Sequence, residues 1–489
     1  MFFKKRKTFL VASMRKVLVA NRSEVACRIF QTCREMGFQT VAVVAPGDEQ
    51  SRHVTYADEI QRVSSYLEID ALLKAAKRSG AFYIHPGYGF LSESFLFAEA
   101  VEKACLCFIG PRSETIRKMA DKVEAKLFVQ KLGIPVLPFV VVRPGEDLSQ
   151  AAQGLGYPLL VKACVGGGGR GIRRVETSNE DLLGLAASAS TEASWAFGES
   201  SFFLERLLRP ARHLEVQIFG DGRGGVWHFG ERECSLQRRH QKIWEEAPAS
   251  SLREETRALL LDASLKIGQA MAYRGVGTLE FLVDASEQYY FLEMNTRLQV
   301  EHAVTEQVSG VDLVGLQMAQ ALSSLILVES VQPRGHAIEV RLCAEDASSG
   351  FIPTSGSIEV LSFPTGAGIR VESGVECGQL IDARFDSLLA KIIVHAPSRS
   401  HALARLRFAL EETVLLGIKT NQNYLRVLLE DPQVQLGRVH TSFLDEFSYT
   451  EVLPQKEDLE LLCSFPTQKP EVFSKNPSPW FHSESRRFV

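Results

Sequence analysis

The sequence has 489 residues, of which 45% are hydrophobic and 23% charged, and its net charge is -4 at pH 7. This composition is typical of a globular protein, and the length allows about three domains. No run reaches the roughly 18 apolar residues of a membrane span. The basic residues are dispersed rather than gathered in a stripe, so the composition argues against both a membrane protein and a nucleic-acid-binding protein.

Nine cysteines are scattered along the chain. The odd number and the wide spacing favour free thiols in a reducing compartment over a disulfide framework, and we expect a cytoplasmic protein. Cys105 and Cys107 are too close for a usual zinc knuckle and lie in an apolar run, so we expect both to be buried in the core. Residues 1–13 contain four consecutive basic side chains and no acidic one, which leaves organellar targeting open beside a plain extension ahead of Met14.

The N-terminal part of the chain predicts an open parallel α/β domain over residues 14–125. An apolar, β-branched strand at residues 16–20 precedes a turn and a helical pattern through residue 37, and a second strand follows at 40–45. Strand and turn signals recur at 83–89 and 105–111. Strands that alternate with helices indicate a parallel sheet. The first turn lacks the glycines of a dinucleotide site.

The rest of the chain divides into three further segments. Residues 126–330 show strand pairs, a glycine run and hairpin signals, which are typical of an α+β nucleotide-binding domain. Residues 331–450 contain short strands and a helical pattern from 402 to 414. Residues 451–489 have little periodicity, and we expect a poorly ordered tail.

A glycine-rich loop follows the strand that begins at residue 159. Lys162 lies at the end of this strand, and four consecutive glycines at 166–169 are followed by an Arg-Gly pair. Backbone N–H groups of such a loop can surround phosphate oxygens while the lysine supplies a positive charge. A plain linker is the alternative, but linkers favour serine and do not usually follow a lysine on a strand.

Two apolar strands at residues 277–283 and 290–295 predict a hairpin with paired carboxylates. If the turn is centred on residues 285–288, Glu280 lies opposite Glu293. Opposed carboxylates repel unless one takes up a proton or a cation lies between them. A divalent ion bound through oxygen, with nucleotide phosphates completing its shell, resolves the conflict.

An alternating polar pattern continues beyond the second strand. Counting every second residue from Glu293 gives Asn295, Arg297, Gln299 and Glu301, which share one face while the chain stays extended. A solvated hairpin face is the commoner origin of such a pattern. The apolar neighbours of these residues favour a metal site that adjoins an arginine and a further carboxylate.

A further feature is the basic segment at residues 231–242, which ends in Arg238, Arg239, His240 and Lys242. Arginine recognises carboxylate or bicarbonate with two parallel hydrogen bonds, so this segment suits an anion beside a metal-phosphate site. Taken alone, it is better explained as a surface charge cluster.

These motifs occur together with others in one order along the chain: residues 20–22, 85–93, the glycine loop, 234–242 with 245–248, 293–302, and Arg341 with 344–346. From about residue 15 to 444 the chain resembles the biotin carboxylase family, a branch of the ATP-grasp ligases. The resemblance implies an ATP-grasp fold with an N-terminal open parallel α/β domain and a C-terminal α+β biotin carboxylase domain that packs against the first. It also implies a homodimer.

The resemblance further implies which residues form the site. ATP would be bound by Lys122, Lys162, Gly168, Gly169, Glu205, Arg206, Leu207, Leu208, His213, Gln237, His240, Glu280 and Glu293. Magnesium or manganese would be bound by Glu280, Glu293 and Asn295, and bicarbonate by Lys242, Arg297, Gln299, the Val300 backbone and Arg341.

In the mechanism that the resemblance implies, Glu301 deprotonates bicarbonate, which attacks the γ-phosphate of ATP to give carboxyphosphate and ADP. Carboxyphosphate then decomposes to CO2 and phosphate, and the phosphate removes the ureido proton of biotin. Arg341 would bind biotin and stabilise the resulting anion, which attacks CO2. Arg297 would orient the reacting groups, and Lys242 completes the catalytic set.

The sequence contains no Ala-Met-Lys-Met biotin attachment signature. The expected partners are therefore a biotin carboxyl carrier protein and carboxyltransferase subunits. The expected role is the first half-reaction of acetyl-CoA carboxylase in fatty acid synthesis, with propionyl-CoA or pyruvate carboxylase as alternatives. A different ATP-grasp ligase and a non-catalytic ATP-binding regulatory subunit also stay open.

Five positions depart from the pattern of the family: Ser23, Cys164, Val165, Trp244 and Ala303. Ser23 and Val165 stand where glycine is usual, and Trp244 is bulkier than the usual aliphatic residue. None of these changes removes a catalytic side chain, but they bear on the rate and on closure of the glycine loop.

Overall fold

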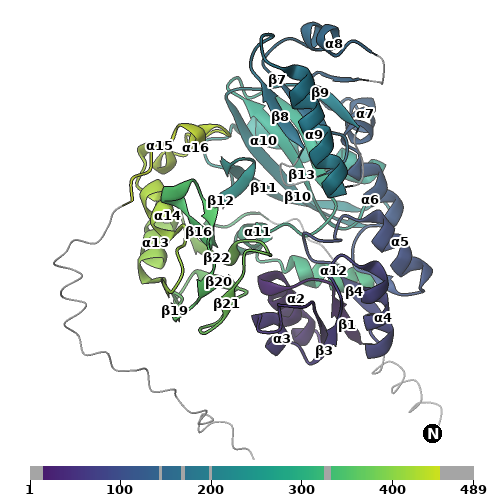
Figure 1. Cartoon of the computed structure of the whole chain (residues 1–489), viewed down its shortest axis with the longest axis vertical. Helices are drawn as coiled ribbons and strands as arrows, with labels where there is room; N and C mark the ends of the chain where they lie inside the picture. The colour runs from purple at the N-terminus through teal and green to yellow at the C-terminus, as the bar shows by residue number, and fades with distance from the viewer. Residues whose placement is uncertain (1–14, 143–145, 167–170, 198–200, 324–331, 452–489) are drawn as a thin grey trace, which may run out of the picture. The chain divides into compact units, whose positions relative to one another are not determined.

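The computed structural model describes residues 15–142, 146–166, 171–197, 201–323 and 332–451. The elements as far as Tyr449 belong to one compact unit (Figure 1). The predicted extension at 1–13, Gly168 and Gly169 of the loop, and all but the first residue of the predicted tail lie outside the described residues. No helix in the described ranges is long and apolar enough to cross a membrane.

The N-terminal part contains the predicted parallel sheet, with five strands in the order β3-β2-β1-β4-β5. Its strands are β1 (Lys16–Val19), β2 (Gln39–Val44), β3 (Glu59–Arg62), β4 (Tyr83–His85) and β5 (Cys107–Phe108), and its helices are α2 (Ser23–Glu35), α3 (Arg52–Tyr56), α4 (Ile69–Ser79), α5 (Phe95–Lys103) and α6 (Ser113–Ala120). Side chains of β1 point alternately into two apolar clusters, one on each face of the sheet. Burial on both faces explains why this strand is apolar throughout.

The prediction that Cys105 lies in the core is wrong, because Cys105 is exposed and Cys107 is only half-buried. Cys105 has a φ of 57° and its N–H bonds the carbonyl of Glu102, so it lies in the turn that ends α5. The strand begins two residues later than the apolar run suggested. Among the described residues, the cysteines at 27, 33, 105, 107, 234, 343 and 377 are free thiols.

A smaller antiparallel sheet carries Lys162. Its strand order is β6-β9-β7-β8, and helices α8 and α9 pack on it (Figure 1). The elements of this region are α7 (Lys122–Lys131), β6 (Phe139–Val141), α8 (Leu148–Leu155), β7 (Leu159–Ala163), β8 (Ile172–Val175), α9 (Leu182–Phe197) and β9 (Phe202–Arg206).

The largest sheet has eight antiparallel strands in the order β14-β13-β10-β11-β12-β15-β22-β20. These strands are β10 (Ala211–Asp221), β11 (Val226–Arg238), β12 (Gln241–Ala247), β13 (Arg274–Asp284), β14 (Tyr289–Asn295), β15 (His336–Cys343), β20 (Ile369–Ser373) and β22 (Leu388–Ala396). The sheet is continuous between β12 and β15. Strands that lie before and after residue 331 therefore share one surface.

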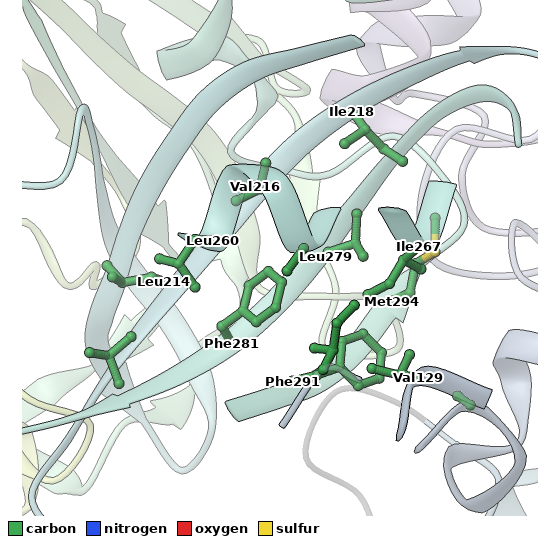
Figure 2. Close-up of a cluster of buried hydrophobic side chains, with 14 of the residues drawn as sticks. Val129, Leu214, Val216, Ile218, Leu260, Ile267, Leu279, Phe281, Phe291 and Met294 are labelled. Atoms are coloured by element: carbon green, nitrogen blue, oxygen red, sulfur yellow. The ribbon is translucent and has the colours of Figure 1, made fainter. Parts of the chain in front are cut away.

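Strand alternation separates the core from the polar face of this sheet. Leu214 and Val216 flank Glu215 on β10, and Leu279 and Phe281 flank Glu280 on β13; the four apolar side chains join one buried cluster. Figure 2 shows this cluster, which Leu260 and Ile267 of α10 (Glu254–Ala270) complete. Because successive side chains of a strand point to opposite faces, both glutamates point away from this core.

The C-terminal elements contribute to two further buried clusters, each of which includes residues of β15 and β22. These elements are β16 (Glu345–Asp346), the 3-10 turn η1 (Ala347–Ser349), β17 (Ile352–Pro353), β18 (Gly356–Ser357), β19 (Val360–Ser362), β21 (Leu380–Ile381), α13 (Arg399–Glu412), β23 (Val414–Leu416), α14 (Gln422–Leu429), α15 (Pro432–Gln435) and α16 (Phe443–Glu446). The predicted helix at 402–414 is α13. Two helices between the cores, α11 (His302–Ser309) and α12 (Leu313–Ala321), contact strands of the large sheet.

Candidate active site

A row of charged residues crosses four strands of the large sheet. Glu293, Glu280, Glu215 and Arg232 are consecutive cross-strand partners on β14, β13, β10 and β11. The predicted pairing of Glu280 with Glu293 is confirmed, although it depends on a register shift: Phe281 pairs with Phe291, so Leu292 is an extra residue on β14. This bulge brings the second glutamate opposite the first.

Lys242 joins this row to Glu301. Its Nζ lies 2.5 Å from Glu215, 2.9 Å from Glu280 and 2.7 Å from Glu301. All three carboxylates are buried, and each has a second basic neighbour: Arg232, His213 and Arg341, respectively. Alternating charges therefore stabilise a cluster that would otherwise repel itself.

The charges of this cluster follow from its contacts. Burial alone would raise the pKa of Glu301, but Lys242, Arg341 and Arg232 lower it to well below its usual value. Burial opposes and the three carboxylates favour the charged form of Lys242, whose pKa is raised well above normal. Glu301 is therefore an ionised carboxylate, able to accept a proton from a substrate placed beside it.

The residues predicted to alternate after Glu293 do converge, although the strand ends at Asn295. Asn295 donates to Glu280 at 2.8 Å and Gln299 donates to the same oxygen at 3.3 Å. Arg297 donates to the side-chain oxygens of Asn295 and Gln299 at 3.0 and 3.1 Å. Beyond Asn295 these hydrogen bonds, rather than strand pairing, keep the side chains together.

Arg341 on β15 reaches the same place from the other half of the sheet. It donates to Glu245 at 2.7 Å and to Glu301 at 3.0 Å. Glu245 and Lys242 are three residues apart on β12, which would put them on opposite faces of a regular strand. Leu236 pairs with Trp244 whereas Gln237 pairs with Lys242, so a bulge at residue 243 corrects the alternation.

The phosphate side of the site contains a buried lysine that the sequence motifs did not indicate. Glu205 on β9 lies between Lys126 of α7, at 2.5 Å, and Lys162 of β7, at 2.8 Å. Burial raises the pKa of Glu205, but the two lysines more than compensate and lower it to about 2. Lys122 pairs with Glu293. Lys122 and Lys162 therefore line this part of the site, and the fully buried amine of Lys126 adds a third positive charge beside them, which suits a polyphosphate.

The remaining predicted ATP residues lie on neighbouring elements. Gln237 of β11 contacts His213 of β10 at 2.5 Å, and His213 lies 3.0 Å from Glu280. His240 occupies the tight turn between β11 and β12 with a φ of 65°. Arg206, Leu207 and Leu208 form the end of β9 and the chain that follows it. The roles of these residues stay predictions.

The donor set at Glu280, Glu293 and Asn295 fits a magnesium or manganese ion. Two carboxylates face each other across β13 and β14, and the amide of Asn295 lies beside them. Such hard oxygen donors suit these ions. His213, Glu215 and Glu280 could also place ligand atoms within 4.8 Å of one another.

Besides Lys126, sequence reasoning gave no site role to four residues: Glu93, Glu215, Arg232 and Glu245. Glu93 accepts a hydrogen bond from Arg297 at 2.9 Å, and so connects the 85–93 motif to the site. A detectable signal existed for Glu215, because the segment 213–218 alternates polar and apolar residues. Glu245 carried no such signal, since the bulge in β12 disrupts the alternation.

Two departures from the family pattern have structural explanations. Ser23 has a φ of 57°, a conformation that favours glycine. Gly374 accommodates this serine, because a Cβ at 374 would lie 1.7 Å from the Ser23 hydroxyl oxygen. The Trp244 side chain is buried in the C-terminal core with Ile338 and Leu406.

Family models cover most of the chain. Residues 13–116 match the biotin carboxylase N-terminal domain, 121–326 the ATP-binding domain of the carbamoyl-phosphate synthase L chain, and 339–446 the biotin carboxylase C-terminal domain. These matches, the opposed Glu280 and Glu293, and Lys162 on β7 define an ATP-grasp enzyme.

Similar sequences and solved structures agree with these family matches. The chain is 42% identical to a biotin carboxylase from a Nostoc species, over 88% of this chain and 99% of the relative. It is 43% identical to the mitochondrial methylcrotonoyl-CoA carboxylase subunit alpha of Glycine max, of which it covers 61%. It is 40% identical to the biotin carboxylase domain of Hydrogenobacter thermophilus 2-oxoglutarate carboxylase, a dimer in complex with MgADP and bicarbonate, with a TM-score of 0.87 over 89% of this chain and 99% of that one. The chain belongs to the biotin carboxylase family, whose reaction is the ATP-dependent carboxylation of biotin.

Proposed function

We propose that this chain carboxylates biotin on a separate carrier protein and activates bicarbonate as carboxyphosphate. The observation that carries the proposal is the single cluster in which Lys242 bridges Glu280 and Glu301 while Arg341 contacts the other oxygen of Glu301. The Lys242 amine therefore contacts both the proton acceptor, Glu301, and a candidate metal ligand, Glu280. The candidate biotin-binding residue, Arg341, contacts the same proton acceptor.

The residues divide the work by chemistry. Lys122 and Lys162 bind phosphate oxygens, and Glu280, Glu293 and Asn295 hold the metal of MgATP, which neutralises phosphate charge when bound. Lys242, Arg297, Gln299 and the Val300 backbone hold bicarbonate. Glu301 accepts the bicarbonate proton. An oxygen of the deprotonated bicarbonate then attacks the γ-phosphate, and ADP leaves.

Arg341 acts in the second step. The phosphate released from carboxyphosphate removes the ureido proton of biotin, and the biotin nitrogen then attacks CO2. The guanidinium of Arg341 stabilises the negative charge on the biotin ureido oxygen. Its two buried carboxylate partners, Glu245 and Glu301, hold it in place for that role.

The proposed partners are a biotin carboxyl carrier protein, carboxyltransferase subunits and a second copy of this chain, in the cytoplasm. Relatives named biotin carboxylase that match over 98% and 99% of their own length support a stand-alone subunit. Acetyl-CoA is the proposed acceptor of the carboxyl group. Domain limits at 125/126 and 330/331 are also proposed. The limit at 330/331 falls between the matches at 121–326 and 339–446, whereas the limit at 125/126 lies inside the match that begins at residue 121 and inside α7.

The experiment measures ADP release by the purified chain with MgATP and free biotin, with bicarbonate present or removed. We expect ADP release that requires bicarbonate and increases with biotin. Glu301→Gln keeps the size of the side chain but cannot accept the bicarbonate proton, and should abolish that release. Nucleotide binding without bicarbonate-dependent release by the wild type would favour a regulatory subunit instead.

A further inference from the structure

A fully buried lysine lies behind the bicarbonate segment, at a position that no motif identified. Lys391 is on β22 and is the direct cross-strand partner of Arg341 on β15. On its other side it pairs with Glu372 of β20. Lys391 therefore stands next to the proposed biotin-binding arginine on the polar face of the sheet.

The Lys391 ammonium contacts the backbone of the site. Its Nζ donates to the carbonyl oxygen of Val300 at 2.6 Å, and lies 2.6 Å from Glu372 and 3.8 Å from Glu339. Burial lowers the pKa of Lys391, but the two carboxylates raise it above its ordinary value, so the group stays charged. A charged donor on a buried carbonyl makes a strong hydrogen bond.

The two neighbouring basic residues hold consecutive parts of one segment. Arg341 bonds the side chain of Glu301, and Lys391 bonds the carbonyl of the preceding residue. The carbonyl of Val300 belongs to the peptide group that leads into Glu301. Fixing this peptide plane therefore limits the directions in which the Glu301 side chain can point.

Helix α11, which follows Glu301, is held by ion pairs that also involve Glu372, the partner of Lys391. Glu306 of α11 pairs with Arg28 of α2 at 3.0 Å and with Arg370 of β20 at 2.8 Å. Arg28 also approaches Glu372 at 3.5 Å. Lys391 and Arg370 thus hold the segment before α11 and the helix itself against strands β20 and β22.

We propose that Lys391 is a positioning residue for bicarbonate activation, which orients the Val300–Glu301 peptide so that Val300 and Glu301 meet the bound bicarbonate. This role rests on the proposed function. It predicts a specific loss for bicarbonate, because the three amines of the phosphate side do not contact Lys391 in the described network.

The test replaces the lysine with an uncharged side chain of similar length, Lys391→Met, in the full chain. We expect kcat/KM for bicarbonate in biotin-stimulated ADP release to fall by about tenfold or more, as for loss of a charge-assisted hydrogen bond. The KM for ATP should stay within about twofold of the wild type. Equal changes for the two substrates, or an unchanged bicarbonate parameter, would overturn the role of Lys391.

The matched control is Arg399→Met, which removes one charge from a buried cluster on the opposite face of the same sheet. Arg399 bonds Glu246 at 2.7 Å, and Glu246 is the residue next to Glu245 on β12. This variant leaves the buried Glu246 without its arginine partner, and should change the kinetic parameters for bicarbonate and ATP to the same extent. A bicarbonate-specific loss of the same size in Arg399→Met would also overturn the proposal.

If Lys391→Met does not fold, Lys391→Met/Glu372→Gln is measured in its place, because it removes one charge of each sign and leaves the net charge unchanged. The same two outcomes then apply. The wild type tests the underlying reaction separately. If it shows no bicarbonate-dependent ADP release, the proposed function is wrong. If it is active and the Lys391 variant behaves like it, only the positioning role is wrong.

Discussion

Replacing Lys242 with methionine tests the charge balance of the site. The change keeps an unbranched side chain of similar length and removes the amine that lies 2.5, 2.9 and 2.7 Å from Glu215, Glu280 and Glu301. Removing one partner of a buried ion pair costs about 3–5 kcal/mol. Glu215 and Glu301 each keep an arginine neighbour, Arg232 and Arg341, so we expect the lower end, about 3 kcal/mol, at pH 8.

The loss should depend on pH with a defined sign. The pKa values of Glu280 and Glu301 in the folded wild type lie below their ordinary value of 4.5; burial raises them, but Lys242 together with the other basic neighbours of each carboxylate lowers them by more. Their contribution to stability is therefore present above about pH 4.5 and is lost as the pH falls through the folded values. Without Lys242 their pKa values rise, so the carboxylates take up protons and the deficit shrinks towards pH 5.

The assay is the melting temperature of the wild type and of Lys242→Met between pH 5 and pH 8. Lys266→Met is the control, because Lys266 is exposed and its pair with Asp262 contributes little. A variant as stable as the wild type at pH 8, or a deficit that does not shrink on acidification, would refute the charge balance described for the cluster.

Two further predictions concern the second half of the sheet. Arg341→Ala should reduce carboxybiotin formation more than bicarbonate-dependent ADP release, since the biotin anion forms after phosphoryl transfer; equal losses in the two assays would contradict its assignment. Burial raises the pKa of Glu245 to about 7, although Arg341 opposes this, and Glu301 raises it further. Its contribution to stability is then present below about pH 4.5 and lost as the pH rises through about 7. Glu245→Gln should therefore flatten the fall in melting temperature between pH 5 and pH 8, and an unchanged slope would refute the shift.

Local periodicity was enough to predict the hairpin and four of the five strands of the first sheet; β3, whose residues alternate between half-buried and exposed, was not predicted. The strand at residues 16–20 and the helix after it could be read from apolar spacing, and the structure has β1 and α2 there. The pairing of Glu280 with Glu293 could be predicted because a hairpin needs only a turn and two strands. The predicted pair was correct, but the prediction did not include the bulge at Leu292 that brings Glu293 opposite Glu280.

Contacts between distant segments could not be predicted in the same way. Arg341 and Lys391 are 50 positions apart and become neighbours only because β15 pairs with β22. Glu245 lies on the polar face only because of the bulge at residue 243. A single sequence carries no local signal for strand order. The family resemblance therefore indicated Arg341 and the segment of Glu245, while Lys391 and the contact between Glu245 and Arg341 required the structure.

The most direct test of the account follows the carboxyl group itself. Isotope-labelled bicarbonate is incubated with the chain, MgATP and a biotinylated carrier, and label on the biotin is measured under alkaline conditions. The account predicts that label appears with ATP present, is absent without ATP, and is lost in Glu301→Gln. ATP-independent labelling, or full labelling by Glu301→Gln, would contradict the assignment of Glu301 as the group that activates bicarbonate.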